Sequence, residues 1–92
     1  MIINVTQQDI DNGNASLDAC PVTIALRRQL KNDKITISRN FIRIPKRRPK
    51  GQWKLVPLPI AAREFILNYY VFLLPQPFSF ILSKKDASVL KG

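Results

Sequence analysis

The sequence predicts a small α+β domain in which a mainly antiparallel sheet packs against two or three helices. Two stretches with apolar residues at helical spacing each begin near a proline, Pro21 or Pro59, and proline is favoured in the first turn of a helix. Residues 34–38, 41–44 and 52–56 alternate apolar and polar side chains, as half-buried strands do. The chain has 92 residues, of which 46% are hydrophobic, so it can form one modest core. A helical bundle is the competing fold.

The first third of the chain predicts a strand followed by two helices. Residues 1–6 are rich in β-branched side chains and end in polar residues, which favours a short strand. Thr6 is placed to cap a short helical turn, with Asp9 three residues later in a capping-box position. The helix that begins near Pro21 is expected to bury Val22, Ala25, Leu26 and Leu30. Its opposite side is expected to contain Thr23, Arg27 and Lys31.

The middle of the chain predicts a β-hairpin with a basic loop. Strands 41–44 and 52–56 are separated by residues 46–51, whose sequence is KRRPKG, and prolines keep this loop away from the core. In the second strand the alternation places Trp53 and Leu55 on one face, which we assign to the core side.

The remaining segments predict a third helix, a last strand and a tail. The helix is expected to run from residue 59 or 60 to about 72, and the strand covers residues 78–83. Residues 84–92 are polar and lack periodicity, so we expect a single compact domain over residues 1–83 and a flexible C-terminal tail, in which Val89-Leu90 could dock. The predicted core contains Val5, Val22, Ala25, Leu26, Ile35, Ile37, Ile42, Ile44, Leu55, Phe65, Ile66, Tyr69, Phe78 and Phe80.

Positive charge is concentrated in one segment of the chain. The formal net charge is +9, and residues 27–54 contain eleven Lys and Arg against one acid, Asp33. The first 26 residues have three acids and no Lys or Arg. A cluster of like charges is costly unless phosphates or carboxylates lie opposite it, so this segment is the first candidate for a binding surface.

The candidate binding residues form a basic ribbon made of two strands and their loop. Its members are Arg39, Arg43, Lys46, Arg47, Arg48, Lys50, Trp53 and Lys54. Arg39 and Arg43 are expected on one strand face, a geometry that can follow a phosphate backbone. Trp53 either stacks on a base or on a partner's ring, or packs in the core as indoles commonly do.

The residue inventory argues against an enzyme and against a bound cofactor or metal. The chain has no histidine and one cysteine, so the commonest general base and a thiolate metal site are both missing. The six acids are scattered, and the three glycines form no phosphate-binding loop. Cys20 precedes a helix and could act as a nucleophile, but the alternative of a buried, inert thiol is favoured because no histidine can activate it.

The sequence favours a cytoplasmic protein outside the membrane. A lone cysteine forms no internal disulfide, and no secretory signal pattern opens the chain. Residues 65–82 are uncharged over eighteen positions, but Pro75-Gln76-Pro77 would break a membrane helix.

Four short segments, in order along the chain, resemble a group of small uncharacterised proteins of tailed bacteriophages and prophages. They are residues 5–13 (VTQQDIDNG), 20–28 (CPVTIALRR), 58–65 with AREF at its end, and 77–80 (PFSF). The resemblance implies a phage-encoded protein acting in the cytoplasm of a bacterial host, and it transfers no catalytic residues. Pro59-Ile60 and the apolar residues 69–74 depart from the group's pattern, which has charged residues there.

Charge and resemblance together predict a small basic binding protein that engages nucleic acid through residues 39–54. One alternative is an inhibitor or modulator that binds an acidic host protein complex, such as an anti-CRISPR protein. A structural or assembly accessory protein, or a merely solvated basic face, are further alternatives. The apolar end of the third helix is expected either to be covered by the last strand and the tail or to form a homodimer contact through Tyr70, Val71, Leu73 and Leu74.

Overall fold

The computed structural model describes residues 1–14, 16–48, 50–70 and 75–91, and it has the α+β fold that the sequence predicts. Its elements are, in chain order, β1 (Ile2–Val5), α1 (Gln7–Asn12), α2 (Pro21–Leu30), β2 (Thr36–Ile37), β3 (Phe41–Pro45), β4 (Trp53–Pro57), α3 (Ile60–Tyr70), β5 (Phe78–Ile81) and α4 (Lys84–Lys91).

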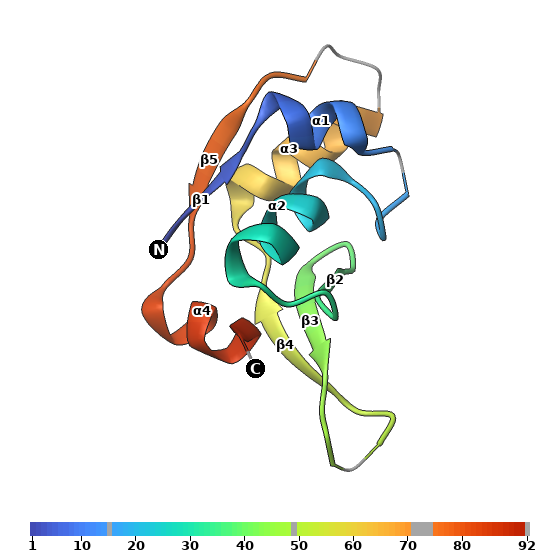
Figure 1. Cartoon of the computed structure of the whole chain (residues 1–92), viewed down its shortest axis with the longest axis vertical. Helices are drawn as coiled ribbons and strands as arrows, with labels where there is room; N and C mark the ends of the chain where they lie inside the picture. Colours follow the sequence, from blue (N-terminus) through green and yellow to red (C-terminus); the bar gives the residue numbers. More distant parts are fainter. Residues whose placement is uncertain (15, 49, 71–74, 92) are drawn as a thin grey trace.

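The strands form two small antiparallel sheets. β1 pairs with β5, and β3 lies between β2 and β4. In the view of Figure 1, α2 lies between the two sheets, and the hairpin β3–β4 extends away from the body at the lower end. The buried side chains of both sheets and of α2 belong to one hydrophobic cluster, so the two sheets share a single core.

A buried carboxylate joins α1 to α2. Asp9 is only 3% exposed, and it forms with Thr6 the capping box that the sequence predicts. Arg28 of α2 donates to the same carboxylate at 2.8 Å and forms an ion pair with it. Burial alone would raise the pKa of Asp9, but the hydrogen bonds from Arg28 and Thr6 outweigh burial and hold this pKa below its usual range.

Two side chains of α2 also protect the free edge of β1. The Gln29 side-chain oxygen accepts from the Asn4 N–H at 2.6 Å, and the Gln29 amide donates to the Ile2 carbonyl at 3.4 Å. Arg28 donates to the Asn4 carbonyl at 3.0 Å. These bonds replace those of a neighbouring strand, so this edge does not present unpaired backbone groups to another chain.

The core contains most of the side chains that the sequence predicts. Tyr69 and Phe78 are half-buried, and their rings stack on Phe65 with centroid distances of 6.1 and 4.6 Å. The buried members are Val5, Val22, Ala25, Leu26, Ile35, Ile37, Ile42, Ile44, Phe65, Ile66 and Phe80.

Two predictions of which side chains point to the core and which to solvent were wrong. Leu55 is 54% exposed and Trp53 is 41% exposed, because β3 sets the register and pairs its buried Ile42 with Val56, which turns Val56 to the core. Thr23, which we expected on the solvent side of α2, is fully buried. Its hydroxyl donates a hydrogen bond to the carbonyl of residue 17 at 2.7 Å.

The C-terminal segment forms a helix, so the expectation of a flexible tail was wrong for residues 84–91, and Gly92 lies outside the described residues. α4 buries Ala87 and Leu90, which are three residues apart and therefore lie on one helix face. The Asn32 side-chain amide donates to the Leu90 carbonyl at 2.8 Å. The packed domain thus continues through residue 91.

The apolar run that we expected to self-associate falls largely outside the described residues. Val71, Leu73 and Leu74 are not described, and of Tyr70 only the backbone is. The homodimer contact therefore stays a prediction. Within the described ranges, every helix is too short or too polar to cross a bilayer.

Replacing Asp9 with Asn should lower the free energy of unfolding at neutral pH by about 1–3 kcal/mol, because it removes the charged acceptor of Arg28 and Thr6. The pKa of Asp9 is lower in the folded state, so its contribution is present above about pH 4 and is lost as the pH falls below that. Urea unfolding of both proteins across this range measures the difference. Asp11→Asn, on the exposed side of α1, is the control and should change little. A constant difference down to pH 2 to 3 would contradict the ion pair.

Replacing Leu90 with Ala should cost about 2–5 kcal/mol in urea unfolding, because the side chain is fully buried where α4 meets the core. Ser88→Ala, on the exposed face of the same helix, should change stability by less than about 0.5 kcal/mol. Equal stability of the two variants would mean that α4 does not pack against the domain.

Candidate functional site

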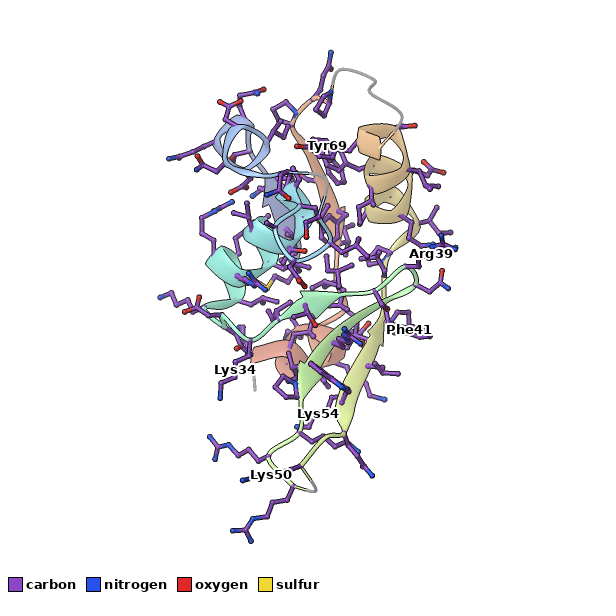
Figure 2. The ribbon with its side chains drawn as sticks, turned by 90° about the vertical axis from the view of Figure 1, so that its right-hand side faces the viewer. Lys34, Arg39, Phe41, Lys50, Lys54 and Tyr69 are labelled. Carbon is purple, nitrogen blue, oxygen red and sulfur yellow. The ribbon has the colours of Figure 1, made fainter. Side chains whose placement is uncertain are left out.

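A concave basic surface lies where the end of α2, the hairpin β3–β4 and the end of α4 meet. We call it the basic groove; it has a volume of about 890 Å³ and is lined by Lys31, Asn32, Lys34, Ile44, Pro45, Lys46, Arg47, Arg48, Lys54 and Lys91. Seven of these ten residues are Lys or Arg. Figure 2 shows Lys34 to one side of the hairpin that carries Lys54, with Lys50 at its far end.

Asn32 organises the side of the groove that α2 contributes. Lys31 ends α2 in the left-handed conformation, with φ 54° and ψ 45°. The Asn32 side-chain oxygen then accepts from the Lys34 N–H at 3.0 Å, and its amide donates to the Leu90 carbonyl at 2.8 Å. One neutral side chain therefore holds Lys31 and Lys34 beside the last turn of α4, which ends at Lys91.

The hairpin supplies the opposite side of the groove. The Lys46 N–H donates to the Gln52 carbonyl at 2.8 Å and closes the loop that the sequence predicts. Gly51 in this loop has a φ of 86°, which other residues adopt only under strain. Lys54 pairs with the buried Ile44, so both project from the same face of the hairpin, toward the groove.

The charge of the basic groove is not neutralised within the described part of the chain. The ion pair found among the described residues joins Arg28 to Asp9, and no carboxylate is among the residues lining the groove. The C-terminal ends of α2 and α4 lie here, but each helix end carries only about half a negative charge. Asp33, between Asn32 and Lys34 in sequence, is exposed and forms no ion pair in the described part of the chain. The seven cations therefore leave an excess of positive charge that an anion in the groove would offset.

The structure divides the predicted binding residues among separate places. Lys50 lies in the loop beyond the groove, whereas Arg43 and Trp53 project from the opposite face of the hairpin, with the Arg43 guanidinium carbon 4.5 Å from the Trp53 ring centroid. Arg39 lies at the other end of the sheet, near α3 (Figure 2), so it does not share a strand face with Arg43 as we expected. The predicted residues that line the basic groove are Lys46, Arg47, Arg48 and Lys54.

Three cations of the groove were absent from the predicted set. Lys31 and Lys34 belong to the basic segment and lie in the connection between α2 and β2. Nothing in the local sequence indicates that this connection lies beside the hairpin. Lys91 was assigned to a flexible tail; the spacing of Ala87 and Leu90 is the signal that could have placed it on a packed helix.

A second hollow, of about 680 Å³, combines Arg39 and Arg63 with an apolar wall formed in part by Ile66. It lies between α3 and the turn that precedes β3. This hollow has two lining cations and the basic groove has seven, so it attracts an anion less strongly.

Other reactive groups are buried or dispersed. Cys20 is buried, with its sulfur 3.3 Å from the Thr23 hydroxyl oxygen, which fits the inert interpretation. The described residues contain no group of three or more His, Cys, Asp and Glu that could hold a metal ion. Comparisons with protein-family models, curated proteins and solved structures each found no match. Function must therefore be inferred from the groove itself.

The stability of this protein should increase with salt, because the uncompensated cations of the groove repel one another in the folded state. Raising the ionic strength from about 0.01 M to about 1 M shortens the screening length from roughly 30 Å to roughly 3 Å and should raise Tm in sodium chloride. Replacing Lys46, Arg47 and Arg48 with Gln should raise Tm at low salt and flatten its salt dependence. Replacing Lys84, Lys85 and Arg63 with Gln instead is the matched control, and it should leave the dependence of Tm on salt concentration largely unchanged. A Tm independent of salt would show that the cations do not repel.

Proposed function

We propose that this protein binds nucleic acid, with backbone phosphates occupying the basic groove. The observation that supports this is the convergence of seven cations from α2, the hairpin and α4 on one concave surface without a lining carboxylate. The chain segments involved are distant in sequence, since Lys31 and Lys91 are brought together by the hydrogen bond from Asn32 to Leu90. A purely solvated surface has no need for such convergence.

The composition of the groove favours phosphates over the carboxylates of an acidic protein. Protein interfaces usually anchor on aromatic or aliphatic side chains at their centre. In the groove the apolar residues are Ile44, which is buried, and Pro45. Affinity would therefore come from charge and hydrogen bonds, as in binding to a phosphate backbone. Lys50 at the loop tip extends the positive surface along the polymer.

The biological setting that we propose is the one implied by the resemblance to phage proteins. In a bacterial host cell, a small basic protein of this kind would associate with phage or host nucleic acid. It would then either protect that nucleic acid or interfere with host machinery that handles it. Sequence specificity is not required by a groove that contacts phosphates.

Reversing Lys46, Arg47 and Arg48 to Glu should lower affinity for a labelled DNA by at least about 100-fold at physiological salt, because phosphate contacts release counterions. Fluorescence anisotropy with single-stranded and duplex DNA measures this. If about five cations contact phosphates, log K should fall against log salt with a slope of about −4.5 for duplex and about −3.5 for single strands.

The matched control reverses Arg63, Lys84 and Lys85, which are exposed and outside the groove. It changes the net charge equally, so it should reduce affinity far less than the groove variant. Equal loss in both variants would mean that net charge, not the groove, drives binding. An association with bacterial lysate that survives nuclease and is lost in the groove variant, together with no binding to DNA or RNA, would replace nucleic acid with an acidic protein.

A further inference from the structure

The face of the hairpin opposite the basic groove is unusually rich in exposed aromatic and apolar side chains. We call it the outer face; it consists of Phe41, Arg43, Pro45, Trp53, Leu55 and Pro57. These residues alternate with the buried Ile42, Ile44 and Val56 and with the exposed Lys54, and Pro45 at the end of β3 also borders the basic groove. Phe41 is 39% exposed and Trp53 is 41% exposed. Figure 2 shows Phe41 and Lys34 on opposite sides of the hairpin.

Two contacts hold the Arg43 side chain in place on the outer face. Its Nε donates to the Thr36 hydroxyl at 3.0 Å, and its guanidinium carbon lies 4.5 Å from the centroid of the Trp53 ring. Among the described residues, the terminal nitrogens of this guanidinium have no hydrogen-bond partner. The side chain is therefore already oriented, and it retains donors for a phosphate or a base edge.

The spacing of the two rings suits separate bases. Trp53 lies opposite Pro45, four residues along β3 from Phe41, which corresponds to roughly 13–14 Å at about 3.4 Å per residue. Residue 43 lies between these two positions along β3, and its guanidinium lies over the Trp53 ring. Exposed aromatic side chains on a sheet can stack on bases only when these are unpaired, because a duplex keeps its bases stacked inside.

The outer face also continues into a positively charged segment. It ends at Pro45 and Trp53, where the hairpin loop with Arg47, Arg48 and Lys50 begins. A strand that places bases on the outer face can therefore place neighbouring phosphates against this loop. The same loop borders the basic groove on the other face of the hairpin.

We propose that the outer face stacks unpaired bases, so that the nucleic acid bound by this protein is single-stranded. Phe41 and Trp53 are the stacking rings, and Arg43 contacts a phosphate or base edge between them. This rests on the proposed function, because the loop and the groove supply the phosphate contacts.

The test uses the intrinsic fluorescence of Trp53, the one tryptophan of the chain. Oligothymidylate should quench this fluorescence and bind more tightly than its duplex with oligoadenylate. In anisotropy measurements, Trp53→Leu and Phe41→Leu should each weaken oligothymidylate binding by about 5- to 150-fold, with duplex binding changed by less than about twofold.

Two further variants separate stacking from folding. Trp53→Phe retains a ring and should retain most of the single-strand affinity, whereas Leu55→Ala, on the same face, removes an exposed side chain without a ring and should have little effect. Equal affinity for single strand and duplex, with no loss in Trp53→Leu or Phe41→Leu, would overturn the stacking proposal while leaving the groove proposal intact. An absence of binding to either form would overturn the proposed function itself.

Discussion

The burial of the Asp9 carboxylate beside Arg28 is the interaction on which the placement of the other elements depends. It fixes α2 against α1, and the next residue of α2, Gln29, holds the edge of β1. β1 pairs with β5, which leads directly into α4. The end of α4 then meets the end of α2 through the bond from Asn32 to the Leu90 carbonyl. The contact of Arg28 in the last turn of α2 thereby helps to position the same end of the helix, from which Lys31 and Asn32 enter the basic groove.

Charge segregation explains why the hairpin extends from the body. Fifteen Lys and Arg against six acids make a uniformly basic surface expensive, and a small core cannot accept buried cations. The hairpin resolves this by burying Ile42 and Ile44 at its base and placing its cations on a loop beyond them. The apolar alternation of β3 therefore anchors the segment, and its charges remain available to a ligand.

Local signals predicted most of the fold, and contacts between distant segments account for what they missed. The Thr6 capping box, the start of α2 at Pro21 and the hairpin loop depend on neighbouring residues and could be read from the sequence. The facing of β4 could not, because Trp53 and Leu55 form the more hydrophobic of its two faces and only the pairing with β3 turns them outward. The groove was predicted only in part for the same reason. Its loop cations are contiguous in sequence, whereas Lys31 and Lys34 after α2, and Lys91 on α4, join them only through packing of distant segments.

The alternation of side chains across a strand gives the hairpin two chemically different faces. Lys54 and Trp53 are adjacent in sequence and therefore project to opposite sides, one into the basic groove and one into the outer face. A flexible loop with the same composition would mix these groups and lose that separation. The core side chains Ile42 and Val56 fix the register of β3 and β4. A shift of β3 by one residue would turn Arg43 into the core and Ile42 to solvent, which would strongly destabilise the domain. The same hydrophobic contacts that stabilise the fold thus keep the cationic and the aromatic groups on their respective faces.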